Sequence, residues 1–434
     1  MRTDFDVIII GAGPAGSSAA ILLARAGWSV ALIEKQRFPR RKVCGECIAA
    51  SNIPLLEALG IGPAFEAVAG PELRKVALMR DDNKIVADLP AANHEKYPWG
   101  RALGRETLDT LLLEQARSAG AEVLQPWAME AIDGKAGDWH CEVHAMDSTA
   151  TRTLRAPVAI DAHGSWEALS SNRPRQSQAR KPSDLFAFKA NFLNASLEDG
   201  LLPILLFDGG YGGMVVADGG VTTVACCIRR DHLKEYRRAS PGLRVGDMIE
   251  AMLKRECGGV NAALHGATRE GTWIAVGPLD PGIRLSVDDD LFRIGNAAGE
   301  AHPIIGEGMS MALQSAWLLC IQLLHTKKDD KNWQRGVGRR YTTQWRQQFV
   351  PRMRLAATFA HLAMRPVSAA SLMALASIWP GLLTLGARLG GKIHSAADSA
   401  AFNFLGSVMS TAAVSSATSS ENFVPLKADL TQIT

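Results

Sequence analysis

The chain has 434 residues, 47% of them hydrophobic, and a formal net charge of +3. This length is sufficient for a sizeable core built from two or three structural units, and the near-neutral charge gives no indication of a nucleic-acid partner. The seven cysteines are scattered, which argues against a disulfide framework, and the one CxxC pair lacks the further ligands of a structural zinc site, so no metal is expected. No secretion signal precedes the first apolar run, residues 7–10, so we expect a cytoplasmic protein.

The first segment, residues 7–33, has the pattern of a βαβ unit: an apolar run, a glycine loop, a helical stretch and a second apolar run. The loop reads GAGPAG, in which Gly11, Gly13 and Gly16 have GxGxxG spacing, and the second run ends at Glu34. Such glycines allow a tight turn, the approach of a pyrophosphate and close helix packing, while the terminal acid accepts ribose hydroxyls. The sequence therefore predicts dinucleotide binding. Further contacts are expected from Pro14, Ala15 and Lys35.

The pattern changes twice along the rest of the chain. Residues 101–120 read as a helix, and the apolar run after Gly120 reads as another strand of the same parallel sheet. Between residues 184 and 276, short β-rich runs separated by glycine turns predict an antiparallel sheet. From residue 291 the order of apolar strand, glycine loop and helix returns, so the first sheet is expected to be completed late in the chain.

These elements predict an α/β fold: a Rossmann-like dinucleotide-binding domain with an inserted antiparallel-sheet substrate domain (an α+β insert) and a helical C-terminal region. The dinucleotide-binding domain is predicted at 1–183 and 278–330. The substrate domain is predicted at 184–277, with part of 70–100 as a further candidate, and the helical region at 331–434. Three prolines are expected to break the helices of that last region, namely Pro351, Pro366 and Pro380.

The late glycine turn, IGNAAGEAHPIIGEGM at 294–309, resembles the second flavin-binding motif of one flavoprotein superfamily, usually written GDAAH followed by P and GxG. This superfamily contains the aromatic hydroxylases (group A flavoprotein monooxygenases) and the geranylgeranyl reductases. The resemblance implies that the Rossmann-like domain is an FAD-binding domain. In that family the acid binds the ribityl chain, the proline lies beside the isoalloxazine, and the following helix start faces the flavin. The residues that take these places are Gly295, Asn296, Pro303, Gly306, Gly308 and Met309, with Asn296 replacing the family's acid.

Three further segments resemble motifs of the same family, and the first two of them follow the family's order. RALGRETLDTLLLEQA is similar to the family's R-x-x-L-D-x-x-L helix, which implies a flavin-side role for Arg105 with Asp109 as its companion. VAIDAHGSWEALS resembles the DG motif, with Gly164 at the cofactor and His163 in place of the usual acid. FPRRKVCGECI is similar to the loop that lies along the flavin. The implied contacts of this loop are Lys42, Cys44, Gly45 and Glu46.

The resemblance implies FAD as cofactor and NAD(P)H as a transient reductant, because no second GxGxxG unit is present to form a nicotinamide domain. The favoured function is a monooxygenase that acts on an aromatic or polyketide-like biosynthetic intermediate or on a peptidyl aromatic residue. The alternatives are a geranylgeranyl-reductase-like enzyme that saturates isoprenoid double bonds and a non-catalytic flavin-binding partner protein. A flavin halogenase is disfavoured because its W-x-W-x-I-P motif is missing.

No catalytic residue can be assigned from the sequence, since the cofactor carries the chemistry. The candidates for the pocket wall are Cys44, Cys47, Tyr211, His302 and Glu307, of which Glu307 is interpreted first as a surface acid. The basic surroundings of the two cysteines would lower a thiol pKa, which makes them candidates for reactive thiols. The alternative interpretation is that these small residues serve close packing.

The charge of the C-terminal part is one-sided. Between residues 331 and 397 the sequence has ten lysines and arginines and no acidic residue. Such a segment is typical of contact with an acidic carrier or partner protein or with a membrane surface, so a peripheral membrane location is a further expectation. The alternative is a solvated basic face packed against an acidic body. No convincing transmembrane segment is present in the sequence.

Overall fold

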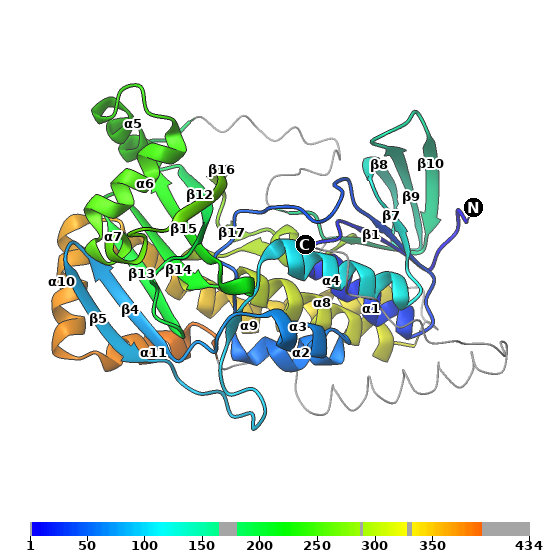
Figure 1. Ribbon diagram of the computed structural model, residues 1–434. Helices are drawn as coiled ribbons and strands as arrows, with labels where there is room; N and C mark the ends of the chain where they lie inside the picture. The colour runs from blue at the N-terminus through cyan, green and yellow to red at the C-terminus, as the bar shows by residue number, and fades with distance from the viewer. Residues whose placement is uncertain (1, 165–179, 287–289, 328–331, 393–434) are drawn as a thin grey trace.

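The computed structural model describes residues 2–164, 180–286, 290–327 and 332–392. Its first layer is a five-stranded parallel sheet in the order β18-β11-β1-β2-β7 (Figure 1). The strands are β1 Val7–Ile10, β2 Val30–Ile33, β7 Glu122–Leu124, β11 Val158–Asp161 and β18 Phe292–Arg293. A strand from residue 292 therefore completes the sheet that residue 7 begins.

Apolar side chains point to both faces of this parallel sheet, because successive residues of a strand face opposite sides, and both faces are covered. Val7 and Ile9 of β1 pack with the helices, whereas Ile8 and Ile10 pack against a three-stranded antiparallel sheet. That small sheet consists of β8 Trp127–Lys135, β9 Asp138–Ala145 and β10 Thr151–Ala156. The helices of the other face include α1 Pro14–Arg25, α4 Arg105–Ser118 and α8 Gly308–His325.

The second large sheet has seven strands in the order β16-β12-β15-β14-β13-β4-β5. Its strands are β4 Lys75–Arg80, β5 Asn83–Asp88, β12 Leu185–Leu193, β13 Leu201–Phe207, β14 Gly210–Val216, β15 Thr222–Arg229 and β16 Thr268–Leu279. Neighbouring strands are antiparallel except β13 and β4, which are parallel. Residues 75–88 therefore belong to the same sheet as the later strands. One face packs against α6 Val245–Glu256 and α7 Gly258–Ala263, with α5 Arg230–Ala239 beside them.

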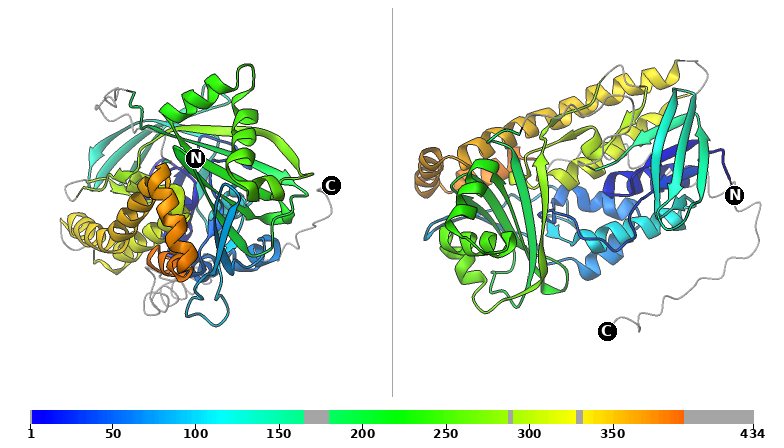
Figure 2. Two further views of the ribbon diagram at one scale, coloured as in Figure 1. Left: turned by 90° about the vertical axis from the view of Figure 1, so that its left-hand side faces the viewer. Right: turned by 90° about the horizontal axis from the view of Figure 1, so that it is seen from above.

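The C-terminal helices cover the other face of the seven-stranded sheet (Figure 2). They are α9 Trp333–Ala363, α10 Pro366–Ile378 and α11 Gly381–Leu389. The expected break at Pro351 is wrong, because this residue lies inside α9. Buried Phe349 and Met353 pack on either side of it, so tertiary packing outweighs the local cost of a helical proline. Pro366 and Pro380 do mark the starts of α10 and α11.

Short elements connect these layers. They are α2 Ile53–Ala58, α3 Gly62–Val68, the pair β3 Cys47–Ile48 and β6 Arg101–Ala102, and the pair β17 Gly282–Ile283 and β19 Gly299–Glu300. In the described part of the chain, no single helix is long and apolar enough to cross a membrane. Only α9 and α10 taken together pass that test, and they are bent by 107°. The mixed architecture confirms the predicted fold class.

Candidate functional site

One cavity of about 710 Å³ extends from the carboxyl ends of the parallel strands to the seven-stranded sheet and the C-terminal helices. Its dinucleotide-fold end contains almost all of the residues expected to bind the cofactor. These residues are Gly11, Gly13, Pro14, Ala15, Glu34, Lys35, Lys42, Cys44, Gly45, Arg105, Gly164, Gly295, Asn296, Pro303, Gly306, Gly308 and Met309. Gly16 lies behind this wall and acts through packing.

The first glycine loop brings the start of α1 against the cavity. Gly11 has a φ of +100°, and a Cβ on Gly16 would lie 1.8 Å from the Gly11 carbonyl oxygen, so both positions require glycine. A Cβ on Gly13 would meet no protein atom closer than 3.8 Å. Gly13 is the N-cap of α1 and no side chain caps this helix. The free N–H groups and the positive helix end therefore suit a pyrophosphate.

Glu34 ends β2 with its carboxylate held in place. It is buried, and it accepts hydrogen bonds from the backbone N–H groups of Ala12 at 3.1 Å and Gln36 at 2.9 Å. The guanidinium of Arg40 lies 3.4 Å away. A carboxylate fixed at this strand end is placed to accept ribose hydroxyls.

Arg105 forms a bidentate ion pair with Asp109, one turn further along α4. The Nε–Oδ1 and Nη2–Oδ2 distances are 2.7 and 2.8 Å, and Asp109 is fully buried. Burial favours a lower pKa for Arg105, but the Asp109 carboxylate outweighs this effect and raises the pKa of the guanidinium. Arg105 therefore remains a fixed positive charge in the cavity wall.

The second glycine turn meets the first one across nearly 300 residues of sequence. A Cβ on Gly295 would lie 3.0 Å from the Cβ of Ala15, so the two turns are packed together. Gly306 adopts a φ of +64°, and α8 begins two residues later at the cavity wall. The N-terminus of this 18-residue helix can stabilise negative charge on a bound group.

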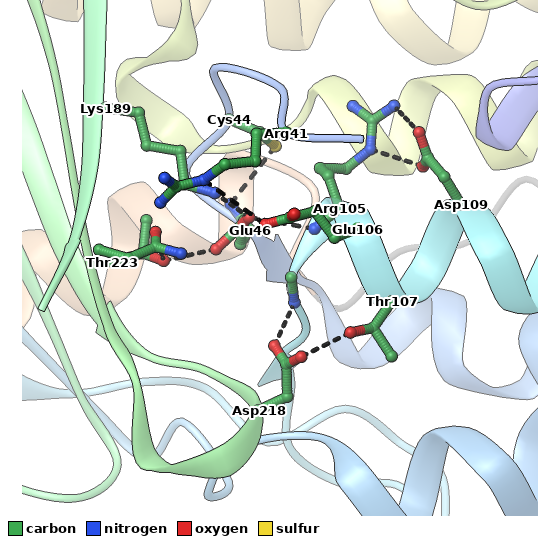
Figure 3. Close-up of polar contacts among 12 residues, drawn as sticks. Arg41, Cys44, Glu46, Arg105, Glu106, Thr107, Asp109, Lys189, Asp218 and Thr223 are labelled. Atoms are coloured by element: carbon green, nitrogen blue, oxygen red, sulfur yellow. Dashed lines mark hydrogen bonds and ion pairs between the residues drawn. The ribbon is translucent and has the colours of Figure 1, made fainter. Parts of the chain in front are cut away.

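Glu46 ties the loop at 38–48 to the seven-stranded sheet (Figure 3). Its side chain is only 2% exposed and forms an ion pair with Lys189 of β12, which is 1% exposed. It also accepts hydrogen bonds from the hydroxyl of Thr223 on β15 and, at 3.0 Å, from the backbone N–H of Arg105. The charged pair is thus enclosed by three separate elements.

Asp218 makes a second link between α4 and the seven-stranded sheet. Its carboxylate accepts hydrogen bonds of 2.6 Å from the backbone N–H of Gly104 and from the hydroxyl of Thr107 (Figure 3). An acid at a helix N-terminus also interacts favourably with the helix dipole. The start of α4 is therefore fixed from the loop side by Glu46 and from the sheet side by Asp218.

The expectation of a lowered thiol pKa is wrong for Cys44. Burial raises the pKa of this thiol, and the nearby guanidinium of Arg105 opposes burial without outweighing it. Cys44 is half-buried and Cys47 is buried, with Lys392 Nζ 3.7 Å from the Cys47 sulfur. Both cysteines line the cavity, and all seven cysteines of the chain are free.

The other three wall candidates occupy different places. Tyr211 lines the cavity and is buried, whereas His302 lies behind it, with Nδ1 3.4 Å from the Tyr211 hydroxyl oxygen. Glu307 is fully buried and also stands behind the wall, which corrects its interpretation as a surface acid. It lies 3.5 Å from Lys392 and 3.8 Å from Arg352. Glu307 therefore connects the start of α8 with the C-terminal region.

The DG-like segment also reaches the cavity. His163 lines it and contacts the buried carboxylate of Asp161 through Nδ1. A Cβ on Gly164 would lie 3.3 Å from Lys42 Nζ, so the loop at 38–48 and this segment are neighbours. The part of the motif after Gly164 lies outside the described residues.

Comparison with known proteins fits this geometry. Residues 4–334 match the family described as the FAD binding domain. The chain belongs to this family. The superfamily expected from the motifs is therefore confirmed, and the glycine loops, the held carboxylate and the fixed guanidinium are consistent with FAD as the dinucleotide.

Three similar proteins differ in the functions that their names describe. The chain is 27% identical over 368 residues to conditioned medium factor receptor 1 of Dictyostelium discoideum, covering 80% of this chain and 68% of that protein. It is 24% identical over 359 residues to digeranylgeranylglycerophospholipid reductase 1 of Methanopyrus kandleri, covering 80% of this chain and 87% of that one. The solved structure of a myxobacterial chondrochloren halogenase is 17% identical, with a TM-score of 0.69 over 94% of this chain and 97% of that one. This last similarity shows the fold alone.

A substitution pair tests the glycine cradle. Gly13→Ala has room within the protein, so we expect ordinary stability but at least about tenfold weaker FAD binding, because the methyl group occupies the pyrophosphate position. Gly16→Ala forces a clash with Gly11 and should lower the free energy of unfolding itself. Thermal melts and FAD titration distinguish the two effects. Full FAD affinity in Gly13→Ala would contradict the assignment.

The buried pair of Glu46 and Lys189 gives a second prediction. Lys189→Met leaves a buried carboxylate without its cation and should lower the free energy of unfolding by about 3–5 kcal/mol. Adding Glu46→Gln should restore part of this loss. The matched control is Lys75→Met, which breaks the exposed pair with Glu198 and should cost less than about 1 kcal/mol in urea unfolding. Equal costs for the two lysines would refute the role of the buried pair.

The half-buried imidazole of His302 predicts a pH dependence of stability. Burial, and then the neighbouring His361, lowers the pKa of His302 from 6.5 to about 4. The folded state therefore disfavours the protonated ring, and stability is lost as the pH falls from 6.5 toward 4, by at most roughly 3 kcal/mol. His302→Gln should flatten this part of the profile. His140→Gln, at a histidine whose side chain is 40% exposed, should leave it unchanged.

Proposed function

We propose that the protein is an FAD-dependent monooxygenase that uses NAD(P)H and O2 to hydroxylate the aromatic or polyketide-like head of a lipophilic substrate. The observation that carries the proposal is the composition of the cavity. Its dinucleotide end has glycines, acids and cations, whereas the other end is lined by aliphatic and aromatic side chains from the sheet and the C-terminal helices. The apolar wall includes Leu202, Ile204, Val276, Leu279, Leu355, Phe359, Leu372, Leu382 and Leu383.

Each part of the wall has a role in this proposal. Bound FAD would supply the redox chemistry, accepting hydride from NAD(P)H and delivering electrons to O2. The N-terminus of α8 and the cation of Arg105 favour negative charge at the cofactor. The apolar end holds the lipophilic part of the substrate and excludes water from the reacting end. NAD(P)H is expected to dock transiently, since one GxGxxG unit is present in the sequence.

The weak acidity of the thiols and the phenol in the cavity wall favours oxygenation over alkene reduction. Saturation of a double bond needs a proton donor beside the substrate, in addition to hydride. Burial raises the pKa of Cys44, lifts that of Cys227 to about 12, and raises those of Tyr211 and Cys226 well above their usual values. These groups are poor acids at neutral pH. Hydroxylation by the cofactor and O2 does not require such a donor from the wall.

Saturation of isoprenoid double bonds is the second candidate. Similarity to the Methanopyrus kandleri reductase extends over 87% of that protein's length. A match of this extent supports a reductase function more strongly than a match confined to the dinucleotide domain would. An elongated prenyl chain also suits the apolar end of the cavity. The two candidates differ in one measurable respect, the need for O2.

The decisive assay follows NAD(P)H oxidation by the FAD-loaded protein with alkyl-substituted phenols or with prenyl lipids. Consumption of O2 that matches the hydroxylated product supports the monooxygenase. Saturated product formed without O2 would overturn it in favour of the reductase. A flavin that turns over under neither condition would favour the non-catalytic binding protein.

A substitution in the apolar end tests whether the substrate tail lies there. Ala387→Trp narrows this end from α11 and should raise KM for a long-tailed substrate by about tenfold, while a short-tailed analogue with the same head is affected much less. Ala239→Trp, at an exposed position on α5 outside the cavity, is the matched control. Equal effects on long and short substrates would place the tail elsewhere.

A further inference from the structure

Helix α10 is apolar on two opposite faces, and only one of them is packed. Its sequence, PVSAASLMALASI, contains no charged residue. Ala369, Met373 and Ala376 are buried against the seven-stranded sheet and its neighbours. The other face follows helical spacing through Val367, Ser371, Ala374, Leu375 and Ile378, all of which are exposed. A helix that is hydrophobic on all sides is normally buried, so we expect this outer face to contact another molecule.

The exposed apolar surface continues through the turn into α11. Val367 and Ile378 are 81% and 83% exposed, and they are joined by Leu375, Trp379, Leu385 and Leu389 at 40% to 57%. α10 lies at the end of the molecule farthest from the N-terminus, clear of the parallel sheet (Figures 1 and 2). We call these six side chains the α10–α11 face. They all fall within residues 367–389, unlike the scattered apolar residues of an ordinary surface.

The charges carried by α10, α11 and the residue before α10 have one sign. Arg365 precedes α10 and Arg388 lies in the last turn of α11, and both side chains belong to exposed residues. Neither helix contains an acidic residue. Arginines around an apolar surface with a tryptophan at its turn are typical of a protein segment that lies in the headgroup region of an anionic bilayer. Neither α10 nor α11 alone is long and apolar enough to span a membrane. This agrees with a segment that lies on the surface of a bilayer.

The same two helices line the apolar end of the cavity. Leu372 of α10 and Leu382, Leu383 and Ala387 of α11 face inward, on helices whose other sides carry the α10–α11 face. A lipophilic substrate taken from a bilayer would therefore have only these helices between its source and the chamber. This continuity favours a lipid surface over an acidic protein as the partner.

We propose that the α10–α11 face docks the protein on the surface of an anionic phospholipid bilayer, and that the bilayer supplies the lipophilic substrate. The supply of substrate rests on the proposed function, whereas docking itself does not. The apolar side chains enter the interface between headgroups and acyl chains, and Arg365 and Arg388 contact lipid phosphates. Binding should weaken as the salt concentration rises, because exposed charges are screened.

Flotation of the FAD-loaded full chain tests docking with vesicles of phosphatidylcholine, alone or mixed with phosphatidylglycerol. We expect binding to the mixed vesicles. Val367→Ser combined with Ile378→Ser should weaken it by about tenfold or more, and Arg365→Gln or Arg388→Gln by about fivefold each. The matched control combines Met146→Ser and Leu243→Ser, which remove exposed apolar side chains elsewhere and should change nothing. Retained flavin absorbance shows that each variant is folded.

Three outcomes would overturn the proposal. One is the absence of vesicle binding by the unaltered protein, and another is unchanged binding by the variant with serines at 367 and 378. The third is a doubled molecular mass that the same variant abolishes, with no flotation, because the face would then belong to a second copy of the chain. Flotation does not depend on turnover. A protein that floats but oxidises no substrate would therefore refute the proposed function and leave docking standing.

Discussion

A buried ion pair between Glu46 and Lys189 holds together the two halves of the candidate site. The loop that carries Glu46 belongs to the dinucleotide side, and Lys189 belongs to the sheet that forms the opposite wall. A charge pair taken out of water is stable only if its geometry and further hydrogen bonds compensate for the lost hydration. Here Thr223 and the start of α4 supply those bonds. The spacing between the dinucleotide fold and the seven-stranded sheet is therefore fixed by an ion pair that tolerates little displacement.

The same separation of roles is visible along the cavity. Polar groups with fixed partners cluster where a charged dinucleotide is expected, and apolar groups line the region where a substrate is expected. Burial leaves the thiols and the phenol of the wall as weak acids. The wall thus offers a bound group a positive helix end and apolar surroundings, while its thiols and its phenol offer no ready acid at neutral pH. This division is consistent with a family in which one fold accompanies several chemistries, as the reductase and the halogenase similar to this chain illustrate.

Local patterns predicted the dinucleotide fold well because its glycines and terminal acid are close in sequence and have one physical purpose each. The late turn at Gly295 could be recognised for the same reason. Lys189 was missed as the partner of Glu46, since nothing in its strand says which distant acid it meets, although a lone lysine within LFAFKANF was a usable signal. Glu307 was misplaced on the surface because its burial depends on Arg352 and Lys392, which approach from the C-terminal region. The helix break expected at Pro351 is absent because the packing of α9 outweighs the local cost of a proline inside a helix.

The parallel pairing of β4 with β13 has a consequence for how the chain can be divided. β4 ends at Arg80 and β13 begins at Leu201, so the seven-stranded sheet draws on residues from both sides of β7 and β11 of the parallel sheet. A fragment limited to 184–277 would leave β13 without its neighbour β4. The unpaired backbone groups at that edge would then favour aggregation. The two halves of this protein are thus interleaved along the chain, and neither can be excised by cutting at two points.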